Sequence, residues 1–533
     1  MCNNRCVFCV SGQLTELRVA KQLPVEPVLA ELEKAAAQGV KKVTFLGGEP
    51  TSQKSFLPAL KLSVELGYDH IVLFTNGVKA RKREWVDKIV AIGKFEWRFS
   101  IQGGDEETHD RIVMRDGAFQ RILDGMTYLQ ELGEDLTVNM CVVKGSYESL
   151  PHYPELMERF GVRQFHIDMF RPSDAGARTD EYFLEVMPRF IDMAPYIEEM
   201  LDRFHAWDPD FDVNIGNYPH CLVPRWAHKV HHGGELTFTV PVNAYNGNNQ
   251  LAPAFNKYED KASDKLYAEG CSRCVFQSQC DGIFEKYDEF FGLDEFKPVT
   301  MEDLREIDTD QNFFVLQVEE ALDPLWREAP PEGWHAKEIF RNTRDRRVEA
   351  RYLDDADRLV TLLILPPEGV GKAITSSAPV MVTDRYRVSL ILTPGVSPDA
   401  VGELVAWAQD RLGEAEGITW ERRSTAAEVV ASIRAPGRAV RAQNRMLRMA
   451  QRIQRQGRFG GGIWRYEGSQ PLDGVMGTSM YISGPNGWGV DLTLKAQLDE
   501  GKSPVGIAYD LRDRTPPEEA RPILQELLET LRG

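Results

Sequence analysis

Three cysteines stand close together at the start of the chain, at Cys2, Cys6 and Cys9, with the spacing C-x3-C-x2-C. Three thiolates on one short loop can hold three irons of a [4Fe-4S] cube, which usually takes four cysteine ligands. The fourth iron would then keep an open position for a substrate or cofactor. A zinc loop is the alternative, but zinc usually pairs C-x2-C with a second ligand pair, which here would have to come from far along the chain.

Two further features near these cysteines suit a nucleotide-like ligand. Phe8, directly before the last cysteine, has a flat side chain that can pack on an adenine ring. The segment Gly47-Gly48-Glu49-Pro50 follows the β-type run VTFL. Its two glycines allow a ligand to approach the backbone closely, and its carbonyl groups and Glu49 offer acceptors for an ammonium group.

The cysteine spacing, the aromatic residue before the last cysteine and the GGEP segment together resemble the radical S-adenosylmethionine (SAM) enzymes. The resemblance implies that GGEP binds the amino group of the methionine moiety of SAM. It also implies that Ser100 contacts the ribose and that Asn139 is a second polar ribose contact. His109 and Asp110 either position the loop after Ser100 or cap the next helix.

The resemblance further implies a reaction. The open iron would chelate SAM, and one electron would cleave it to methionine and a 5′-deoxyadenosyl radical that abstracts hydrogen from a substrate. In such an enzyme the cofactor carries the chemistry and the protein orients and shields it. A low-potential electron donor such as a flavodoxin or ferredoxin is implied as a partner.

Strand-like and helix-like segments alternate after the cysteine loop, which predicts βαβ units and a parallel sheet. The fold class expected is α/β, a partial (β/α)6 radical SAM barrel with ligands at the carboxyl ends of its strands. The family's first strand, before the cysteine loop, is missing, so we expect the true start to lie upstream. The strands expected are 42–46, 70–75, 95–101, 136–143 and 162–170, and the helices 25–39, 56–66, 84–92, 118–132, 150–160 and 181–204.

A second cysteine group lies further along, at Cys271, Cys274 and Cys280, with Cys221 before it. Four thiolates close a second [4Fe-4S] cluster, and the arrangement resembles the auxiliary-cluster extensions called SPASM and Twitch, the shorter Twitch form in particular. A structural zinc is the alternative. His220 is a candidate for a contact that supports a ligand, and a hairpin is predicted from the strand 236–242 and the polar loop 243–249.

The domains expected are a radical SAM barrel (1–205), an auxiliary-cluster extension (206–305) and a C-terminal α+β domain (306–533). In the last, a strand, a Thr-Pro pair and a helix occur twice, at 387–412 and 505–531, which suggests a duplicated unit. Seven arginines from Arg438 to Arg458 are spaced three and four residues apart and share one helical face. They either face the acidic body of the protein or solvent, or bind an acidic ligand such as RNA or a carboxylate-rich peptide.

The 533-residue chain has a formal charge of −18, which disfavours nucleic acid and anionic membranes as partners of the protein body. No apolar run reaches the ~20 residues of a membrane span, no signal peptide opens the chain, and the clustered cysteines suit a reducing cytoplasm. The function expected is a radical SAM enzyme that modifies a peptide or protein side chain. The alternatives are an enzyme of small-molecule or cofactor biosynthesis and a non-catalytic iron-sulfur electron carrier.

Overall fold

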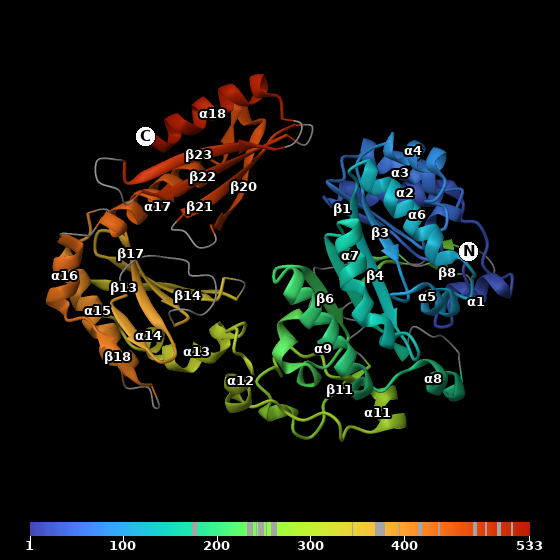
Figure 1. Ribbon diagram of the computed structural model, residues 1–533, viewed down its shortest axis with the longest axis horizontal. Coiled ribbons are helices and arrows are strands. Elements are labelled where there is room, and N and C mark those ends of the chain that lie inside the picture. The colour runs from blue at the N-terminus through green and yellow to red at the C-terminus, as the bar shows by residue number, and fades with distance from the viewer. Residues whose placement is uncertain are drawn as a thin grey trace. The chain divides into compact units, whose positions relative to one another are not determined.

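The computed structural model divides the chain into two compact units, Met1–Ile307 and Asp308–Gly533, which are considered separately (Figure 1). The residues it describes are 1–172, 179–231, 238–240, 242–243, 250–251, 253–256, 264–343, 345–367, 379–393, 395–413, 418–434, 438–472, 477–485, 488–497, 503–512 and 515–532.

The first unit is built on a six-stranded sheet in which strands follow one another in chain order and every neighbouring pair is parallel. The α/β class and the parallel sheet predicted from the sequence are therefore confirmed. The strands are β1 Lys42–Phe45, β2 His70–Thr75, β3 Glu96–Ser100, β4 Asp135–Val142, β5 Gln164–Met169 and β6 Asp212–Gly216.

Two helices precede β1, and the others connect successive strands, as the right-handed crossovers of a parallel sheet require. They are α1 Val10–Glu16, α2 Val25–Ala37, α3 Phe56–Glu65, α4 Arg83–Val90, α5 Glu106–Val113, α6 Ala118–Glu131, α7 Tyr153–Phe160, α8 Asp180–Val186 and α9 Phe190–Trp207.

Two expectations for this unit are wrong. Strand β6 was not predicted, and the single helix expected over 181–204 is two helices, α8 and α9. Pro188 explains the break, because a proline drives the preceding residue out of the helical region. Met187 accordingly has an extended backbone (φ −83°, ψ 118°).

The strands alternate between apolar and polar residues, and the two kinds face opposite sides of the sheet. Trp97, Phe99, Val138 and Phe165 are fully buried in one core with residues of the surrounding helices. In a parallel sheet that is buried on both faces, each strand is a continuous run of hydrophobic residues. The alternation here instead gives the sheet a polar face, which carries Arg98, Ser100, Thr137, Asn139, Gln164, His166, Asp168 and Asn214.

Glu96 closes the amino-terminal end of this polar face. Its carboxylate accepts hydrogen bonds from Arg98 (2.7 Å), Thr137 (2.8 Å) and Arg163 (2.9 Å) and lies 2.8 Å from the His70 ring. Burial raises the pKa of Glu96, but the charge of Arg98 and the hydrogen bonds from Thr137 and His70 outweigh it and lower the pKa to about 2. The network joins β2, β3, β4 and the start of β5.

After α9, the first unit continues through short strands. The predicted hairpin is present as β8 Val242–Asn243 paired antiparallel with β9 Gln250–Leu251; its loop, 244–249, lies outside the described residues. The strand expected over 236–242 is instead two short pieces, β7 and β8. The remaining elements are β7 Phe238–Thr239 with β10 Phe255–Asn256, β11 Lys265–Leu266 with β12 Ile283–Phe284, and helices α11 Glu285–Phe291 and α12 Met301–Ile307.

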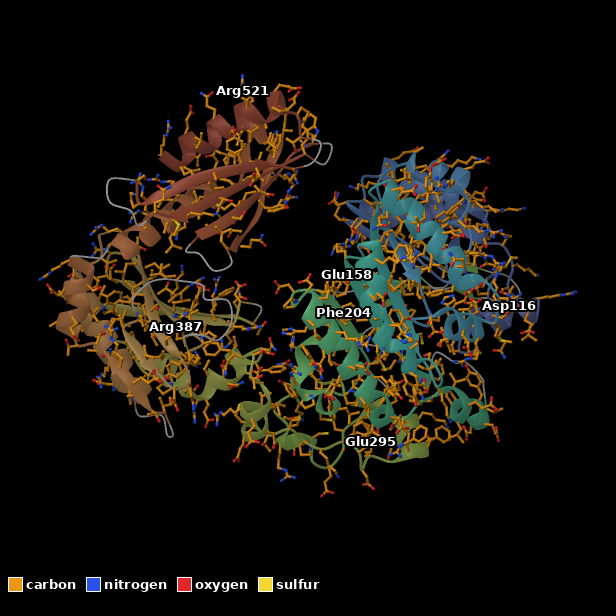
Figure 2. The ribbon with its side chains drawn as sticks, viewed as in Figure 1. Asp116, Glu158, Phe204, Glu295, Arg387 and Arg521 are labelled. Atoms are coloured by element: carbon orange, nitrogen blue, oxygen red, sulfur yellow. The ribbon has the colours of Figure 1, made fainter. Side chains whose placement is uncertain are left out.

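An aromatic contact attaches this region to α9. The ring of Tyr287 stacks on Phe190, with centroids 4.5 Å apart. The Tyr287 hydroxyl donates to Glu295 (2.5 Å) and accepts from the Phe190 backbone N–H (2.8 Å). Glu295, which Figure 2 labels, also pairs with Arg189 at 2.9 Å, so the segment after the second cysteine group is fixed to the start of α9.

The second unit contains two sheets, each with its own apolar core and helices. The first sheet has the order β13-β14-β15-β17-β16-β18 and the second β19-β20-β21-β22-β23. The elements are α13 Phe314–Leu322, α14 Pro324–Arg327, β13 Trp334–Asn342, β14 Arg347–Asp354, β15 Leu359–Leu365, β16 Met381–Thr383, β17 Arg387–Leu392, α15 Pro398–Gly413, β18 Trp420–Arg423, α16 Ala426–Arg434, α17 Arg438–Gln456, β19 Arg458–Phe459, β20 Trp464–Pro471, β21 Gly477–Ser483, β22 Gly489–Ala496, β23 Val505–Leu511 and α18 Pro517–Arg532.

Each sheet contains a strand that is followed by a threonine and then a helix, as predicted, at β17–α15 and at β23–α18. Every strand pair within them is antiparallel. That the two are copies of one ancestral unit stays a prediction.

We predict that Glu96→Gln destabilises the first unit by about 3 kcal/mol at neutral pH, the value of a pKa held at about 2 instead of 4.5. A depressed carboxyl pKa stabilises above the unfolded pKa, and this contribution is lost as pH falls from about 4.5 towards 2. Calorimetric melting at pH 7 and at pH 4 measures the effect. The exposed Glu84→Gln is the control, and equal melting of both variants at pH 7 would contradict the prediction.

Candidate functional site

The three N-terminal cysteines lie on a loop that leads into α1. Cys9 stands at the N-cap of that helix, and its backbone N–H donates to the carbonyl of Cys6 (3.0 Å). The loop is fastened to the end of α5 by the N–H groups of Arg5 and Val7, which donate to the carbonyls of residues 113 (3.1 Å) and 112 (3.0 Å). All three cysteines are partly exposed and none is in a disulfide, so their sulfurs are available as ligands.

The thiols of this loop stand close enough to influence one another. Burial raises the pKa of Cys6, and the neighbouring Cys9 and Cys2 raise it further. Burial also raises the pKa of Cys2, although the Asn4 backbone N–H, 3.5 Å from the Cys2 sulfur, favours its thiolate. A metal centre is the usual way to ionise buried thiols together, because the bound cation deprotonates them.

The GGEP segment follows β1 and touches the start of the chain. A Cβ on Gly48 would lie 2.3 Å from the Met1 carbonyl oxygen, so only glycine admits the N-terminal backbone here. The Glu49 backbone N–H donates to that same oxygen (2.9 Å). Gly47 has φ +127°, a conformation suited to glycine, and Pro50 begins a short 3₁₀ helix, Pro50–Ser52.

Glu49 joins this turn to the end of β2. One carboxylate oxygen accepts from the hydroxyls of Thr51 (2.6 Å) and Thr75 (2.8 Å), and the other from the Asn76 backbone N–H (2.8 Å). Burial raises the pKa of Glu49, which is 1% exposed, while these donors favour its charged form. In the structure the Glu49 carboxylate holds two strand ends together. A contact between Glu49 and the ammonium group of SAM stays a prediction.

Asn76 completes the connection to the cysteine loop. Its side-chain amide donates to the Asn3 side chain (2.7 Å) and lies 3.7 Å from the Cys2 sulfur. The Thr-Asn-Gly turn after β2 therefore shapes the site. Phe8 is partly buried and packs against the core of the unit.

Ser100 and Asn139 lie side by side on the polar face. They are register partners on β3 and β4, and Asn139 is in turn paired with His166 on β5. Gln102 bridges two strand ends, donating to the Ser100 hydroxyl (2.6 Å) and accepting from the Cys141 N–H (2.9 Å). The two ribose contacts implied by the resemblance thus occupy neighbouring positions near the carboxyl ends of the strands.

His109 and Asp110 serve different purposes. The ring of His109 accepts from the Gln102 backbone N–H (3.0 Å), and burial lowers its pKa to about 4, so it is neutral and positions the loop after Ser100. Asp110 accepts from the N–H groups of Gly117 and Phe119 at the start of α6. Each of the two interpretations of this pair therefore holds for one of its residues.

Sequence reasoning missed a group at the ends of β5 and β6. The His166 ring lies 3.0 Å from one Asp168 oxygen, and the Asn217 amide donates to the other (3.1 Å). A Cβ on Gly216 would lie 2.3 Å from the Asp168 carboxylate, so this glycine makes room for it. The alternation of HIDM and DVNIG carries the signal, since it places these polar residues on the face of Ser100.

The four later cysteines also come together. Cys221, Cys271, Cys274 and Cys280 line one pocket. Burial, followed by the nearby Cys280, Cys274 and Cys271, raises the pKa of Cys221 to about 12. The N–H groups of Gly282 and Val299 point at the sulfurs of Cys280 (3.4 Å) and Cys274 (3.5 Å). These donors favour thiolates, so the residues present fit a metal centre.

Two histidines near the second cysteine group differ in position. His220 is buried next to Cys221, with its ring 5.5 Å from that of Phe276, and both line the same pocket. His231 is exposed, and its neighbour at 232 lies outside the described residues. Across the described residues no three His, Cys, Asp or Glu side chains are grouped tightly enough for a single metal ion. A four-iron cluster is larger than one ion, and its ligands lie further apart.

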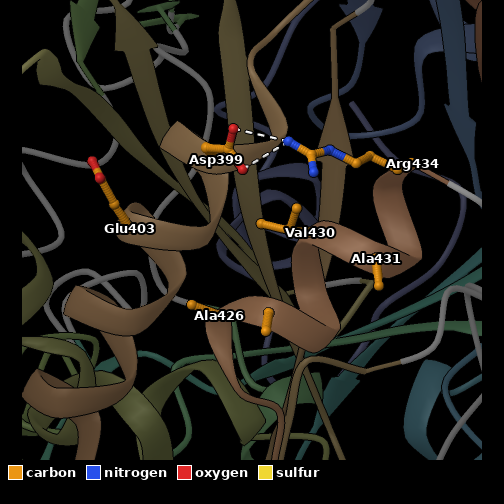
Figure 3. Close-up of a pocket in the computed structure, with 7 residues that line it drawn as sticks. Asp399, Glu403, Ala426, Val430, Ala431 and Arg434 are labelled. Atoms are coloured by element: carbon orange, nitrogen blue, oxygen red, sulfur yellow. Dashed lines mark hydrogen bonds and ion pairs between the residues drawn. The ribbon is translucent and has the colours of Figure 1, made fainter.

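The second unit has a different kind of hollow, of about 570 Å³, between α15 and α16 (Figure 3). Small apolar side chains, among them Ala426, Val430 and Ala431, form its floor. Arg434 bridges both oxygens of Asp399 at its edge, each at 2.9 Å. No cysteine or histidine lines it, so it offers no site for the chemistry considered above.

No described helix is long and apolar enough to span a membrane.

Residues 1–153 match the family model described as the Radical SAM superfamily. This part of the chain is a radical SAM domain, and the recognition made from the cysteine and GGEP motifs is confirmed. The matched region contains the first cysteine loop, the GGEP turn, Ser100 and Asn139. It ends before the second cysteine group, whose assignment as a SPASM- or Twitch-like extension stays a prediction.

Similar proteins include an AdoMet-dependent heme synthase of Methanosarcina barkeri, 29% identical over 180 residues (34% of this chain and 51% of that protein). A PqqA peptide cyclase of Methylorubrum extorquens is 27% identical over 167 residues (31% and 42%). The chain thus spans about half the length of the curated relatives it matches. Among solved structures, Streptococcus suis SuiB bound to the precursor peptide SuiA aligns with a TM-score of 0.36 and 17% identity, covering 54% of this chain and 70% of that one.

We predict that Gly48→Ala displaces the N-terminal backbone, because the added Cβ would clash with the Met1 carbonyl. Cys2 would then be misplaced, and the iron bound after anaerobic reconstitution should fall by about four per chain, the content of one cube. Gly93→Ala, whose Cβ would meet side-chain atoms of Val64 (3.3 Å) and Phe95 (3.4 Å) but no backbone atom, is the control. Full iron content in Gly48→Ala would show that the close approach is not needed.

Proposed function

We propose that this protein is a radical SAM enzyme, in which Cys2, Cys6 and Cys9 hold a [4Fe-4S] cluster that binds SAM. The observation that carries the proposal is the attachment of the cysteine loop to the GGEP turn and to the end of β2, through Glu49 and Asn76. Ligands of parallel α/β folds bind at such strand ends. A reduced cluster with SAM bound there supplies the 5′-deoxyadenosyl radical.

The residues on the polar face would orient the adenosyl group. Ser100 and Asn139 present a hydroxyl and an amide on neighbouring strands, and Gln102 fixes the Ser100 hydroxyl. Gly47, Gly48 and Pro50 would offer backbone carbonyls to the amino group of SAM, with Phe8 near the adenine.

We further propose that residues 206–305 form an auxiliary extension of the short, Twitch-like kind. Cys221, Cys271, Cys274 and Cys280 would close a second [4Fe-4S] cluster, since they share one pocket and two of them receive backbone N–H donors. A structural zinc is the competing occupant. Residues 1–205, joined by strand β6 (Asp212–Gly216) of the same sheet, would form the partial barrel, and residues 306–533 a separate α+β domain.

The substrate proposed is a side chain of a peptide or protein. The similarity to a PqqA peptide cyclase favours this class. The group at His166, Asp168 and Asn217 supports it, because hydrogen-bonding groups beside the proposed adenosyl site can orient the amide and polar atoms of a peptide. Biosynthesis of a small molecule is the alternative, favoured by the similarity to an AdoMet-dependent heme synthase. A flavodoxin or ferredoxin in the cytoplasm would supply the electron.

We predict that anaerobically reconstituted protein, given dithionite and SAM, forms 5′-deoxyadenosine. Cys6→Ala should abolish this product, since two thiolates cannot hold the cube. Cys274→Ala should still bind SAM at the first cluster but lose the second, so that iron falls from about eight to about four per chain. Iron analysis, electron paramagnetic resonance and chromatography measure these outcomes. Cys141→Ala is the matched control, and zinc in place of iron in the wild type would overturn the assignment.

We predict that an extract of the source organism stimulates 5′-deoxyadenosine formation and that prior protease digestion removes the stimulation. Digestion destroys a peptide or protein substrate but leaves small molecules intact. An extract incubated with heat-inactivated protease is the control. Stimulation that survives digestion would instead favour the small-molecule alternative.

A further inference from the structure

One stretch of the second unit is strongly cationic within a chain of net charge −18. Between Glu428 and Glu467 there is no acidic residue, no lysine and no histidine, but there are nine arginines. Most of them belong to α17. We call Arg441, Arg445, Arg448, Arg452 and Arg455 the arginine stripe.

Packing of α17 fixes the direction in which the stripe faces. Ala442, Met446, Met449 and Ile453 are buried in the core beneath strands β20 to β23. The stripe arginines, at spacings of three and four residues, are all exposed. Because the apolar face is anchored on the sheet, the helix cannot turn to hide its charged face. Figure 1 shows α17 and α18 with this sheet.

In the described residues, the acidic side chains of the neighbouring helix α18 form no ion pair with Arg445, Arg448 or Arg455. Arg452 donates to the Leu531 carbonyl (2.9 Å) at the end of α18. Glu526, an acidic side chain of α18, accepts instead from the Gln456 amide and the Gly460 N–H. Among the residues that the structure describes, no carboxylate forms an ion pair with Arg445, Arg448 or Arg455. Like charges three and four residues apart destabilise a helix, so repulsion among the stripe arginines destabilises α17 unless an anion binds them.

We propose that the arginine stripe is a docking surface for a carboxylate-rich peptide segment of another protein. Guanidinium groups bind carboxylates through two parallel hydrogen bonds, a geometry that lysine lacks. Arginines repeated along one helix face match a run of acidic side chains. The stripe supplies concentrated positive charge within a chain of net charge −18, so it is complementary to an acidic partner.

The same observations disfavour nucleic acid as the occupant. Single-stranded nucleic acid usually stacks its bases on aromatic side chains, and α17 contains none. A long polyanion would also meet the repulsion of the remaining acidic surface. A short acidic segment contacts the stripe alone. The proposal goes beyond the radical chemistry and does not depend on it, so either can fail without the other.

The test uses the full-length protein and three labelled probes of equal length: a peptide alternating glutamate and serine, the same peptide with glutamine for glutamate, and a single-stranded RNA of matched charge. Fluorescence anisotropy at low and near-physiological salt measures their affinities. The acidic peptide should bind most tightly, and its affinity should fall as salt rises because the charges are exposed. The neutral peptide should not bind.

Arg445→Glu/Arg448→Glu should weaken binding of the acidic peptide by about tenfold or more, because attraction becomes repulsion. The variant relieves like-charge contacts within α17 and should stay folded, which circular dichroism checks. Lys337→Glu/Arg422→Glu changes the net charge by the same amount at two exposed sites on another sheet and should bind like the wild type. Equal weakening by this control, tighter binding of the RNA, or no binding of the acidic peptide would each overturn the proposal.

Discussion

Thiols that are buried together resist ionisation, and this constraint governs both cysteine groups. At Cys6 and at Cys221, burial is the largest cause of the raised pKa, and neighbouring thiols add to it. The scaffold compensates only in part, with backbone N–H donors at Cys2, Cys274 and Cys280. A bound cation, as proposed for both groups, would supply the rest, because charge in a low-dielectric site needs a counter-charge. The stability of each group would then depend on what it binds.

The position of the cysteine loop also depends on residues other than its three cysteines. The Met1 carbonyl, Glu49, Asn76 and Asn3 form a continuous path of hydrogen bonds from the cysteine loop to the ends of β1 and β2. Glu49 receives donors from both strand ends, so its charge is used to assemble the site. Misplacing any member of this path would move the cysteine loop relative to Ser100 and Asn139. The distance between the proposed cluster and the proposed adenosyl site would then change.

Much of this arrangement could be predicted from the sequence, because period-two alternation and strand-end motifs are local signals. The first five strands were found within two residues of their observed bounds. The recognition of the family rested on the cysteine loop and the GGEP segment, which the structure joins by a hydrogen bond from the Glu49 N–H to the Met1 carbonyl. The sequence did not reveal β6, because the five residues DVNIG give too short an alternation to distinguish a strand from a loop. Nor could it show that the Glu49 carboxylate accepts from Thr75, since that contact forms only when β1 and β2 are paired. Pro188 indicates the break between α8 and α9, but the helical periodicity of residues 181–204 continues across it and led to the prediction of a single helix.

The distribution of reactive side chains separates the roles of the two units. All eight cysteines belong to the first unit, and of ten histidines only His335 belongs to the second. The second unit, residues 308–533, therefore has no thiol to bring to a cluster. Each of its sheets buries one face against its own helices and has its own apolar core. A surface that recognises a partner needs only stable helices and exposed charge, both of which α17 provides.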